Sequence, residues 1–192
     1  MLICGSALAA RPDGYILSLS WAPQFCADDR HAENPECVLD AGFILHGLWP
    51  EPYDRHEPDC ATDQRVAEAT IEHMLPIMPS RGLIIHEWHK HGACTGLAPD
   101  AYFALAERAF RDIRIPISFV SPRGVTRTDS AAIKRDFANV NPQLHATDIE
   151  LSCGRGQLLE VRICLTATLT PNACPAPEQN RCDGTLIVQT RH

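Results

Sequence analysis

Cysteine number and spacing constrain this chain more than any other feature of its sequence. There are nine cysteines, too many for a cytosolic enzyme without metal sites, and no two are spaced as Cys-x-x-Cys. Zinc ribbons and thioredoxin-like motifs are therefore unsupported, and the pattern predicts disulfide bridges formed in an oxidising compartment. The cysteines stand at positions 4, 26, 37, 60, 94, 153, 164, 174 and 182.

The odd cysteine count has an explanation at the N-terminus. Residues 1–10 are apolar and contain Ala7-Leu8-Ala9, which resembles a small-x-small cleavage site. We expect them to be the remainder of a signal peptide, whose removal takes Cys4 away and leaves eight cysteines. An ordinary apolar N-terminal segment is the alternative. No other stretch approaches the roughly 18 apolar residues of a membrane span, so we expect a soluble mature protein without membrane contact.

Length and charge limit the architecture and the partners. The chain has 192 residues and 45% hydrophobic content, enough for a sizeable core, and we expect residues 11–192 to form one domain. Its formal net charge is −7. Binding along a phosphate backbone by counterion release requires many Lys and Arg contacts, so any nucleic acid should be gripped locally, over a few nucleotides.

The periodicity of apolar residues changes along the chain from strand to helix and back to strand. The predicted elements are strands at 15–21 and 41–46, helices from Thr62 or Asp63 toward Pro76 and from Pro99 to Ile113, a loop at 118–128, a helix from Asp129 or Ser130 through Phe137, and strands at 148–153, 157–165 and 185–188. A turn at 154–156 predicts an antiparallel hairpin. Without regular β-α-β alternation, this order favours an α+β fold with a mainly antiparallel central sheet flanked by helices.

Residues 84–92 concentrate ionisable side chains after a short apolar run. If the segment is helical, His86, Glu87, Lys90 and His91 share one face, because successive residues turn by about 100°. Trp88, Ile84 and Ile85 then anchor the segment against a core. A second apolar run, 41–46, brings His46 to what we expect to be a strand end, where a reactive group is both held and exposed.

Two motifs carry a resemblance to a known family. His46-Gly47-Leu48-Trp49-Pro50 and, about forty residues later, 86–92 (His-Glu-Trp-His-Lys-His-Gly) are similar to the two signature motifs of the T2 family of ribonucleases. The resemblance implies a disulfide-stapled RNase T2-like fold. It also implies four bridges, which are Cys26–Cys37, Cys60–Cys94, Cys153–Cys182 and Cys164–Cys174.

The resemblance implies an endoribonuclease for single-stranded RNA that needs no metal or other cofactor. In such an enzyme the ribose 2′-OH attacks the adjacent phosphorus, giving a 2′,3′-cyclic phosphate that is then hydrolysed to a 3′-phosphate; DNA lacks that hydroxyl and is not a substrate. His91 is expected to be the base and His46 the acid of the first step. Lys90 is expected to stabilise charge on the phosphate, protonated His86 to hold it, and Glu87 either to orient His91 or to keep its imidazolium charged.

Base recognition is the least determined part of this expectation. Trp49 is a candidate platform for stacking a base or a core residue, and Glu51 and Tyr53 are either base contacts or parts of a solvated loop. Trp88 is expected in the core and His89 in solvent. We expect a secreted or periplasmic monomer.

Other classes of protein fit less well. His86, His89 and His91 are possible metal ligands, but Lys90 occupies the second ligand position of the zinc-protease pattern His-Glu-x-x-His, and its charge would repel a metal. A cysteine nucleophile is disfavoured because Cys94 is expected in a bridge. A binding module that kept the fold without the chemistry would lack a catalytic residue, and none is missing.

Overall fold

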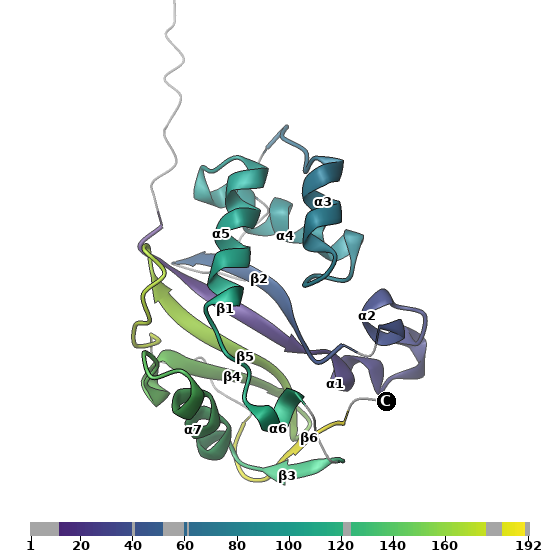
Figure 1. Ribbon diagram of the computed structural model, residues 1–192, viewed down its shortest axis with the longest axis vertical. Helices are drawn as coiled ribbons and strands as arrows, with labels where there is room; N and C mark the ends of the chain where they lie inside the picture. The colour runs from purple at the N-terminus through teal and green to yellow at the C-terminus, as the bar shows by residue number, and fades with distance from the viewer. Residues whose placement is uncertain are drawn as a thin grey trace, which may run out of the picture.

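The computed structural model describes residues 12–39, 41–51, 60, 62–120, 124–175 and 182–190 (Figure 1). The predicted signal-peptide remainder, residues 1–10, lies outside these ranges.

A six-stranded sheet forms the centre of the fold, in the order β2-β1-β5-β6-β3, with β4 also paired to β5. All pairs are antiparallel except β5 with β6, which is parallel. The predicted α+β fold with a mainly antiparallel sheet is thus confirmed. The strands are β1 (Gly14–Trp21), β2 (Phe43–Glu51), β3 (Thr126–Thr128), β4 (Ile149–Gly154), β5 (Gln157–Thr166) and β6 (Leu186–Val188).

Side-chain alternation along the central strands separates a core face from a site face. Leu17, Leu19 and Trp21 of β1 are buried in the main core, whereas Ser18 and Ser20 point to the other face. The predicted hairpin between β4 and β5 is present. Its two loop residues, Arg155 and Gly156, both have positive φ (52° and 74°), which the tight two-residue turn requires.

The second strand differs from its prediction. It does not end at His46 but continues to Glu51, with Pro50 paired to Tyr15. Proline is tolerated there because β2 is an edge strand and needs no outward hydrogen bond. The register shifts so that Ser18 faces Gly47 while Leu19 faces Leu45, which leaves His46 as the extra residue of a β-bulge.

Seven α-helices and three short 3₁₀ helices are formed by the described residues. They are α1 (Ala22–Cys26), α2 (Pro35–Val38), α3 (Glu68–Met74), α4 (Arg81–Lys90), α5 (Pro99–Arg111), α6 (Ile117–Val120), α7 (Ser130–Val140), η1 (Asp29–His31), η2 (Gly92–Thr95) and η3 (Ala146–Asp148). The predicted helices at Pro99 and Asp129 are confirmed. Pro99 occupies the first turn of α5, and the Asp129 side chain caps α7 by accepting from the N–H of Ala132.

Three sequence expectations about helices and loops were wrong. The helix expected from Thr62 begins at Glu68, because the Thr62 hydroxyl accepts from the N–H of Gln64 and closes a local turn instead. The expected loop at 118–128 contains most of α6 and the short strand β3. Ile85 does not anchor α4, since its side chain is 38% exposed; Ile84 and Trp88 do.

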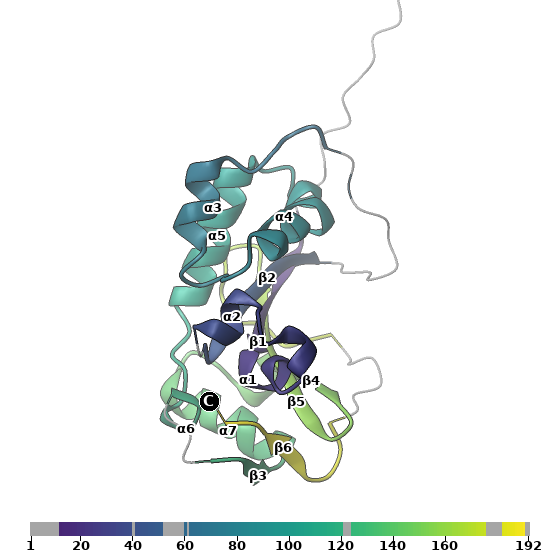
Figure 2. The ribbon, with the colours of Figure 1, turned by 90° about the vertical axis from the view of Figure 1, so that its right-hand side faces the viewer.

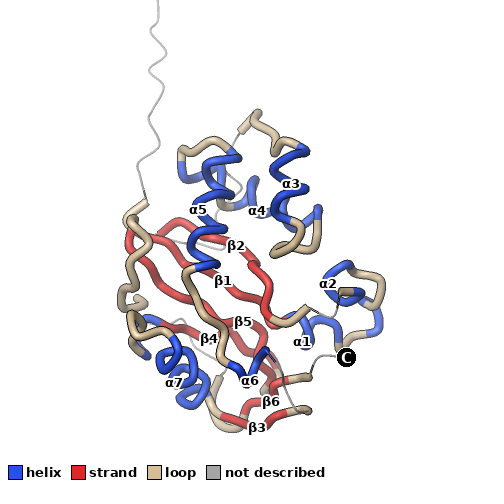
Figure 3. Tube along the Cα trace, in the orientation of Figure 1, coloured by secondary structure: helices blue, strands red, loops and turns tan. Residues whose placement is uncertain are grey.

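Helices α3, α4 and α5 gather at one end of the molecule, and α6 and α7 lie at the other (Figures 1 and 2). The tube in Figure 3 shows β1, β2, β4 and β5 between these two groups, with β3 and β6 next to α6. Trp88 is buried in the core, as predicted, and its indole N–H donates to the carbonyl of Gln64. Within the described ranges, no helix is long and apolar enough to cross a membrane.

Four disulfides connect the loops to this framework, and they are the pairings that the family resemblance implies: Cys26–Cys37, Cys60–Cys94, Cys153–Cys182 and Cys164–Cys174. Cys94 lies in η2, directly after the helix that carries Glu87. The Cys60–Cys94 bridge therefore ties the chain that follows β2 to the end of α4.

Candidate active site

The bulge in β2 directs His46 across its neighbouring strand. β1 lies between β2 and β5, and Ser20 of β1 stands directly opposite Glu160 of β5. The His46 Nδ1 atom lies 3.2 Å from the Ser20 hydroxyl and 2.6 Å from Glu160 Oε1. Because Ser20 is small, the imidazole reaches a carboxylate two strands away.

Arg162 holds the other oxygen of Glu160. Its Nε and Nη2 donate to Glu160 Oε2 at 2.9 and 2.6 Å, and its guanidinium lies 4.9 Å from the centre of the Trp49 ring. Sequence reasoning missed Ser20, Glu160 and Arg162. A signal was present, because Glu160 and Arg162 alternate with buried apolar residues on β5 and so had to share the face opposite the core.

Helix α4 contributes the buried carboxyl group of Glu87, which lies close to side chains of both signature motifs. Glu87 is 1% exposed, and its Oε2 accepts a 2.9 Å hydrogen bond from the Trp49 indole. Its Oε1 lies 3.6 Å from His46 Nε2, and its Oε2 lies 3.9 Å from His91 Nε2. The two imidazoles, which come from different elements, therefore flank one carboxyl group.

Two motif glycines permit this close packing. A Cβ on Gly47 would stand 1.9 Å from Glu87 Oε2, and one on Gly92 would stand 2.5 Å from the Trp88 ring. Any side chain at Gly47 would displace the Glu87 carboxyl group and the Trp49 indole, which are hydrogen-bonded to each other. Glycine is thus the residue that lets the histidine strand and the carboxylate helix approach each other.

His91 lies just beyond the end of α4, with φ −129° and ψ −51°, and is 4% exposed. The backbone N–H of His91 donates to the backbone carbonyl of Glu87. The Trp49 ring lies 5.3 Å from the His91 ring and 5.4 Å from the His46 ring, centre to centre. His86 is exposed on the same helix, and Lys90 is half-buried.

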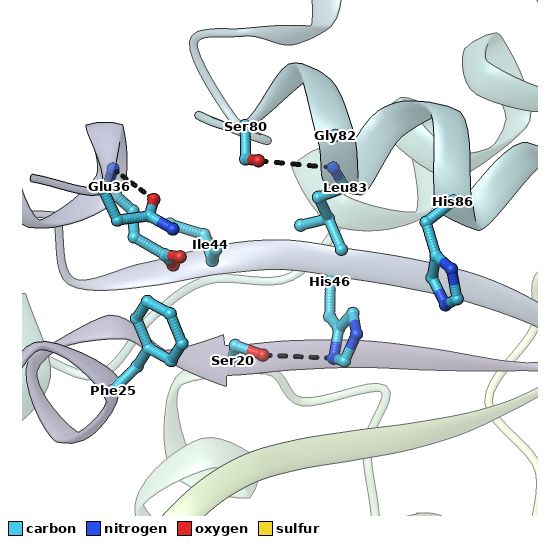
Figure 4. Close-up of a pocket in the computed structure, with 10 residues that line it drawn as sticks. Ser20, Phe25, Glu36, Ile44, His46, Ser80, Gly82, Leu83 and His86 are labelled. Atoms are coloured by element: carbon cyan, nitrogen blue, oxygen red, sulfur yellow. Dashed lines mark hydrogen bonds between the residues drawn. The ribbon is translucent and has the colours of Figure 1, made fainter. Parts of the chain in front are cut away.

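A cleft of about 420 Å³ opens beside these groups (Figure 4). Figure 4 shows His46 and His86 toward one end of it and Phe25 and Glu36 toward the other. It is lined by Ser20, Phe25, Asn34, Glu36, Ile44, His46, Ser80, Gly82, Leu83 and His86. A ligand in this cleft would therefore contact both polar side chains and apolar surface next to His46 and His86.

Residues 12–174 match the model of the Ribonuclease T2 family. The chain belongs to the ribonuclease T2 family. Among its relatives, a ribonuclease of Aeromonas hydrophila is 42% identical over 94 residues, which are 49% of this chain and 43% of that protein. A probable ribonuclease of Haemophilus influenzae is matched over 47% of its length, so the chain spans about half the length of these two relatives.

Other T2 relatives align over most of their length. Ribonuclease I of Escherichia coli is 26% identical, with 92% of this chain and 85% of that protein covered. The solved structure of ribonuclease MC1 from bitter gourd seeds has a TM-score of 0.71 at 20% identity, covering 91% and 98% of the two chains. This structural likeness shows that the T2 fold is shared.

The environment of His46 in this T2 chain favours its charged form. Burial lowers the pKa of His46, but the hydrogen bond to Glu160 and the charges of Glu160 and Glu87 outweigh burial, so the pKa lies above its ordinary value. Burial raises the pKa of Glu160, yet its bonds to His46 and Arg162 bring that pKa down to about 2. His46 and Glu160 thus form an ion pair.

The environment of His91 has the opposite effect. Burial, helped by positive charge at His46, His86 and Lys90, lowers the pKa of His91 to about 3. Burial raises the pKa of Glu87 to about 7. At mildly acid pH, therefore, His46 is protonated while His91 is neutral.

Of the three residues expected to contact a base, one is buried, one is half-buried and one lies outside the described residues. Trp49 is 3% exposed and packs with Ile16 and Cys164, so the structure favours the core alternative over a stacking platform. Glu51 is half-buried at the end of β2, and Tyr53 lies outside the described residues.

His89 is half-buried on α4, away from the fully solvated position we expected. In the part of the chain that the structure describes, no three His, Cys, Asp or Glu side chains are grouped as a metal ion requires, and His86, His89 and His91 form no such group.

Proposed function

We propose that this chain cleaves single-stranded RNA by transphosphorylation, with His46 and His91 as acid and base and without a metal. Membership of the ribonuclease T2 family supports the activity. The observation that carries the mechanism is the placing of both Nε2 atoms against the two oxygens of Glu87, at 3.6 and 3.9 Å, with the pKa values of the two imidazoles moved in opposite directions.

In the first step His91 Nε2 takes the proton of the ribose 2′-OH, and the oxygen attacks the adjacent phosphorus. The P–O5′ bond breaks, and His46 Nε2 donates a proton to the departing 5′-oxygen. The product is a 2′,3′-cyclic phosphate. When water opens the ring the roles exchange, because His46 is then neutral and His91 protonated, and a 3′-phosphate remains.

The remaining groups of the proposed site bind the phosphate, stabilise its charge or orient His91. Lys90 stabilises negative charge on the phosphate oxygens of the transition state, and His86, at the mouth of the cleft, holds the phosphate when protonated. Glu87, held by the Trp49 indole, orients His91 and stabilises its imidazolium once a proton has arrived.

We also propose a substrate site, a compartment and a state of assembly. The cleft beside His46 and His86 is large enough to hold part of a nucleotide, and Glu51 and Tyr53 are retained as candidate base contacts. The four disulfides fit an oxidising compartment, so we place the protein outside the cell or in a periplasm, acting as a monomer.

The test is to incubate purified protein with an RNA oligonucleotide and its DNA counterpart in the presence of a chelator. We expect cleavage of RNA alone, with cyclic phosphate ends appearing before 3′-phosphate ends. His46→Ala and His91→Ala should each lower turnover by about 10²- to 10⁴-fold, the range for general acid and base groups. A His91→Ala protein with near-normal cleavage contradicts the assignment, and an inert wild-type protein points to a binding module instead.

A further inference from the structure

We propose that Glu160, fixed by Arg162, is a positioning residue that selects the Nδ1-protonated form of His46 and keeps this imidazole charged as the acid. The inference rests on the proposed function and adds a residue from β5 that neither signature motif contains. Glu160 is 114 residues from His46 in the chain, and its Oε1 lies 2.6 Å from His46 Nδ1.

The geometry divides the two oxygens of Glu160 between two partners. Oε1 accepts from His46, and Oε2 accepts two bonds from Arg162, which itself lies over the Trp49 ring. The side chains of Glu160 and Arg162 are only 11% and 17% exposed. A carboxylate held in this way by a planar guanidinium has little freedom to turn, so it fixes the plane and direction of the imidazole.

This contact decides which nitrogen works on the substrate. An ionised carboxylate only accepts hydrogen bonds, so Nδ1 must carry a proton. Proton exchange with the substrate is left to Nε2, which lies 3.6 Å from Glu87 Oε1, while His91 Nε2 lies 3.9 Å from the other oxygen of the same carboxyl group. The arrangement is the logic of a carboxylate that orients a catalytic histidine and stabilises its imidazolium without being protonated itself.

Several polar and ionisable groups surround His46. Glu160 is the ionised group among them that forms a direct hydrogen bond with the imidazole. The groups facing this region are Ser20 from β1, Glu160 and Arg162 from β5, Glu87 and His86 from α4, Glu36 from α2, and His91. Glu87 stands 3.6 Å from Nε2, beyond hydrogen-bond distance, and burial favours its neutral form. The lasting negative charge beside His46 is therefore that of Glu160.

The first experiment compares the pH profile of kcat/KM for a dinucleoside phosphate in wild type, Glu160→Gln and Glu160→Asp. Gln keeps the size and an accepting oxygen but removes the charge. We expect the basic limb to move to lower pH by about one unit or more, because the acid loses the charge that favours its protonated form. At neutral pH kcat should fall about 10-fold or more, with KM little changed, and Asp should restore much of the basic limb.

Glu107→Gln is the matched control. Glu107 also bridges a histidine and an arginine, His73 at 2.8 Å and Arg111 at 2.7 Å, but it lies on the surface of α5, away from the site. The loss of that exposed cluster should leave kcat/KM and its pH profile unchanged. A basic limb that stays in place in Glu160→Gln overturns the proposal.

A second measurement does not depend on activity. Nitrogen-15 NMR of the His46 ring should show Nδ1 protonated throughout the titration and Nε2 as the titrating atom, with a lower midpoint in Glu160→Gln. If wild type fails to cleave RNA, the proposed function fails while this titration still tests the role of Glu160. If Glu160→Gln does not fold, the wild-type ring decides: neutral His46 protonated at Nε2 contradicts the proposal.

Discussion

His46 and His91 are the same residue type in opposite environments. His46 faces an ionised carboxylate, whereas His91 is buried among groups that carry positive charge when protonated. Burial lowers the pKa of both rings, and for His46 the hydrogen bond to Glu160 and the charges of Glu160 and Glu87 reverse this effect. This separation of the two pKa values is what the proposed acid and base roles require at one pH.

A pH profile of kcat/KM on RNA tests this separation. Activity needs His91 neutral, so it rises as pH passes the lowered pKa of His91, about 3. It needs His46 protonated, so it is lost as pH rises through the raised pKa of His46. We expect a bell-shaped profile with its maximum on the acid side of neutrality. Activity that climbs steadily from pH 5 to pH 8 is inconsistent with these roles.

At the scale of elements, the site depends on how closely the bulged strand β2 and helix α4 approach. Their contact is the hydrogen bond from Trp49 to Glu87, and it exists because Gly47 has no side chain. The bulge then directs His46 toward β5, while α4 ends in time to turn His91 inward. Neither element alone presents both imidazoles.

Gly47→Ala tests this contact, because the added methyl would stand 1.9 Å from Glu87 Oε2. Because the methyl would overlap the Glu87 carboxyl group and the Trp49 Nε1 atom, which are hydrogen-bonded to each other, both buried side chains must shift, and we expect a loss of about 1–3 kcal/mol in the free energy of unfolding. We also expect turnover to fall by about 10²-fold, as for a misplacement near 1 Å. Denaturant unfolding and RNA cleavage on the same sample are the measurements. Unchanged values for both would show that the strand and helix are not in this close contact.

At the scale of the whole molecule, disulfides hold together parts that have little core of their own. Cys26–Cys37 closes the segment carrying α2, which forms one end of the cleft, and Cys60–Cys94 joins the chain after β2 to η2. The second bridge spans 34 residues and the first spans 11. The longer loop restricts the unfolded chain more.

Paired Cys→Ala variants test this difference. Loop-closure entropy gives about 4 kcal/mol for the Cys60–Cys94 bridge and about 3 kcal/mol for Cys26–Cys37, so both variants should unfold at lower denaturant concentration, the first at the lowest. Removing Cys60–Cys94 should also lower turnover, because it frees the segment directly after α4, next to His91. Equal stability of the two variants, with full activity in both, contradicts this account.

The sequence by itself determined the fold class, the family and the chemical groups of the two motifs, because short motifs and the periodicity of apolar residues are enough to predict each of them. It also predicted that Trp88 lies in the core and that helices begin at Pro99 and Asp129. These features depend on helix capping and on the spacing of apolar residues, which are local in the sequence. Only the tertiary structure decided that His46 sits in a bulge, that β2 passes Pro50, that Trp49 is buried, and that Glu160 with Arg162 stands behind His46. Those facts depend on which strands pair and in what register. Strand pairing brings together residues more than a hundred positions apart, and the local sequence around one of them does not predict the other.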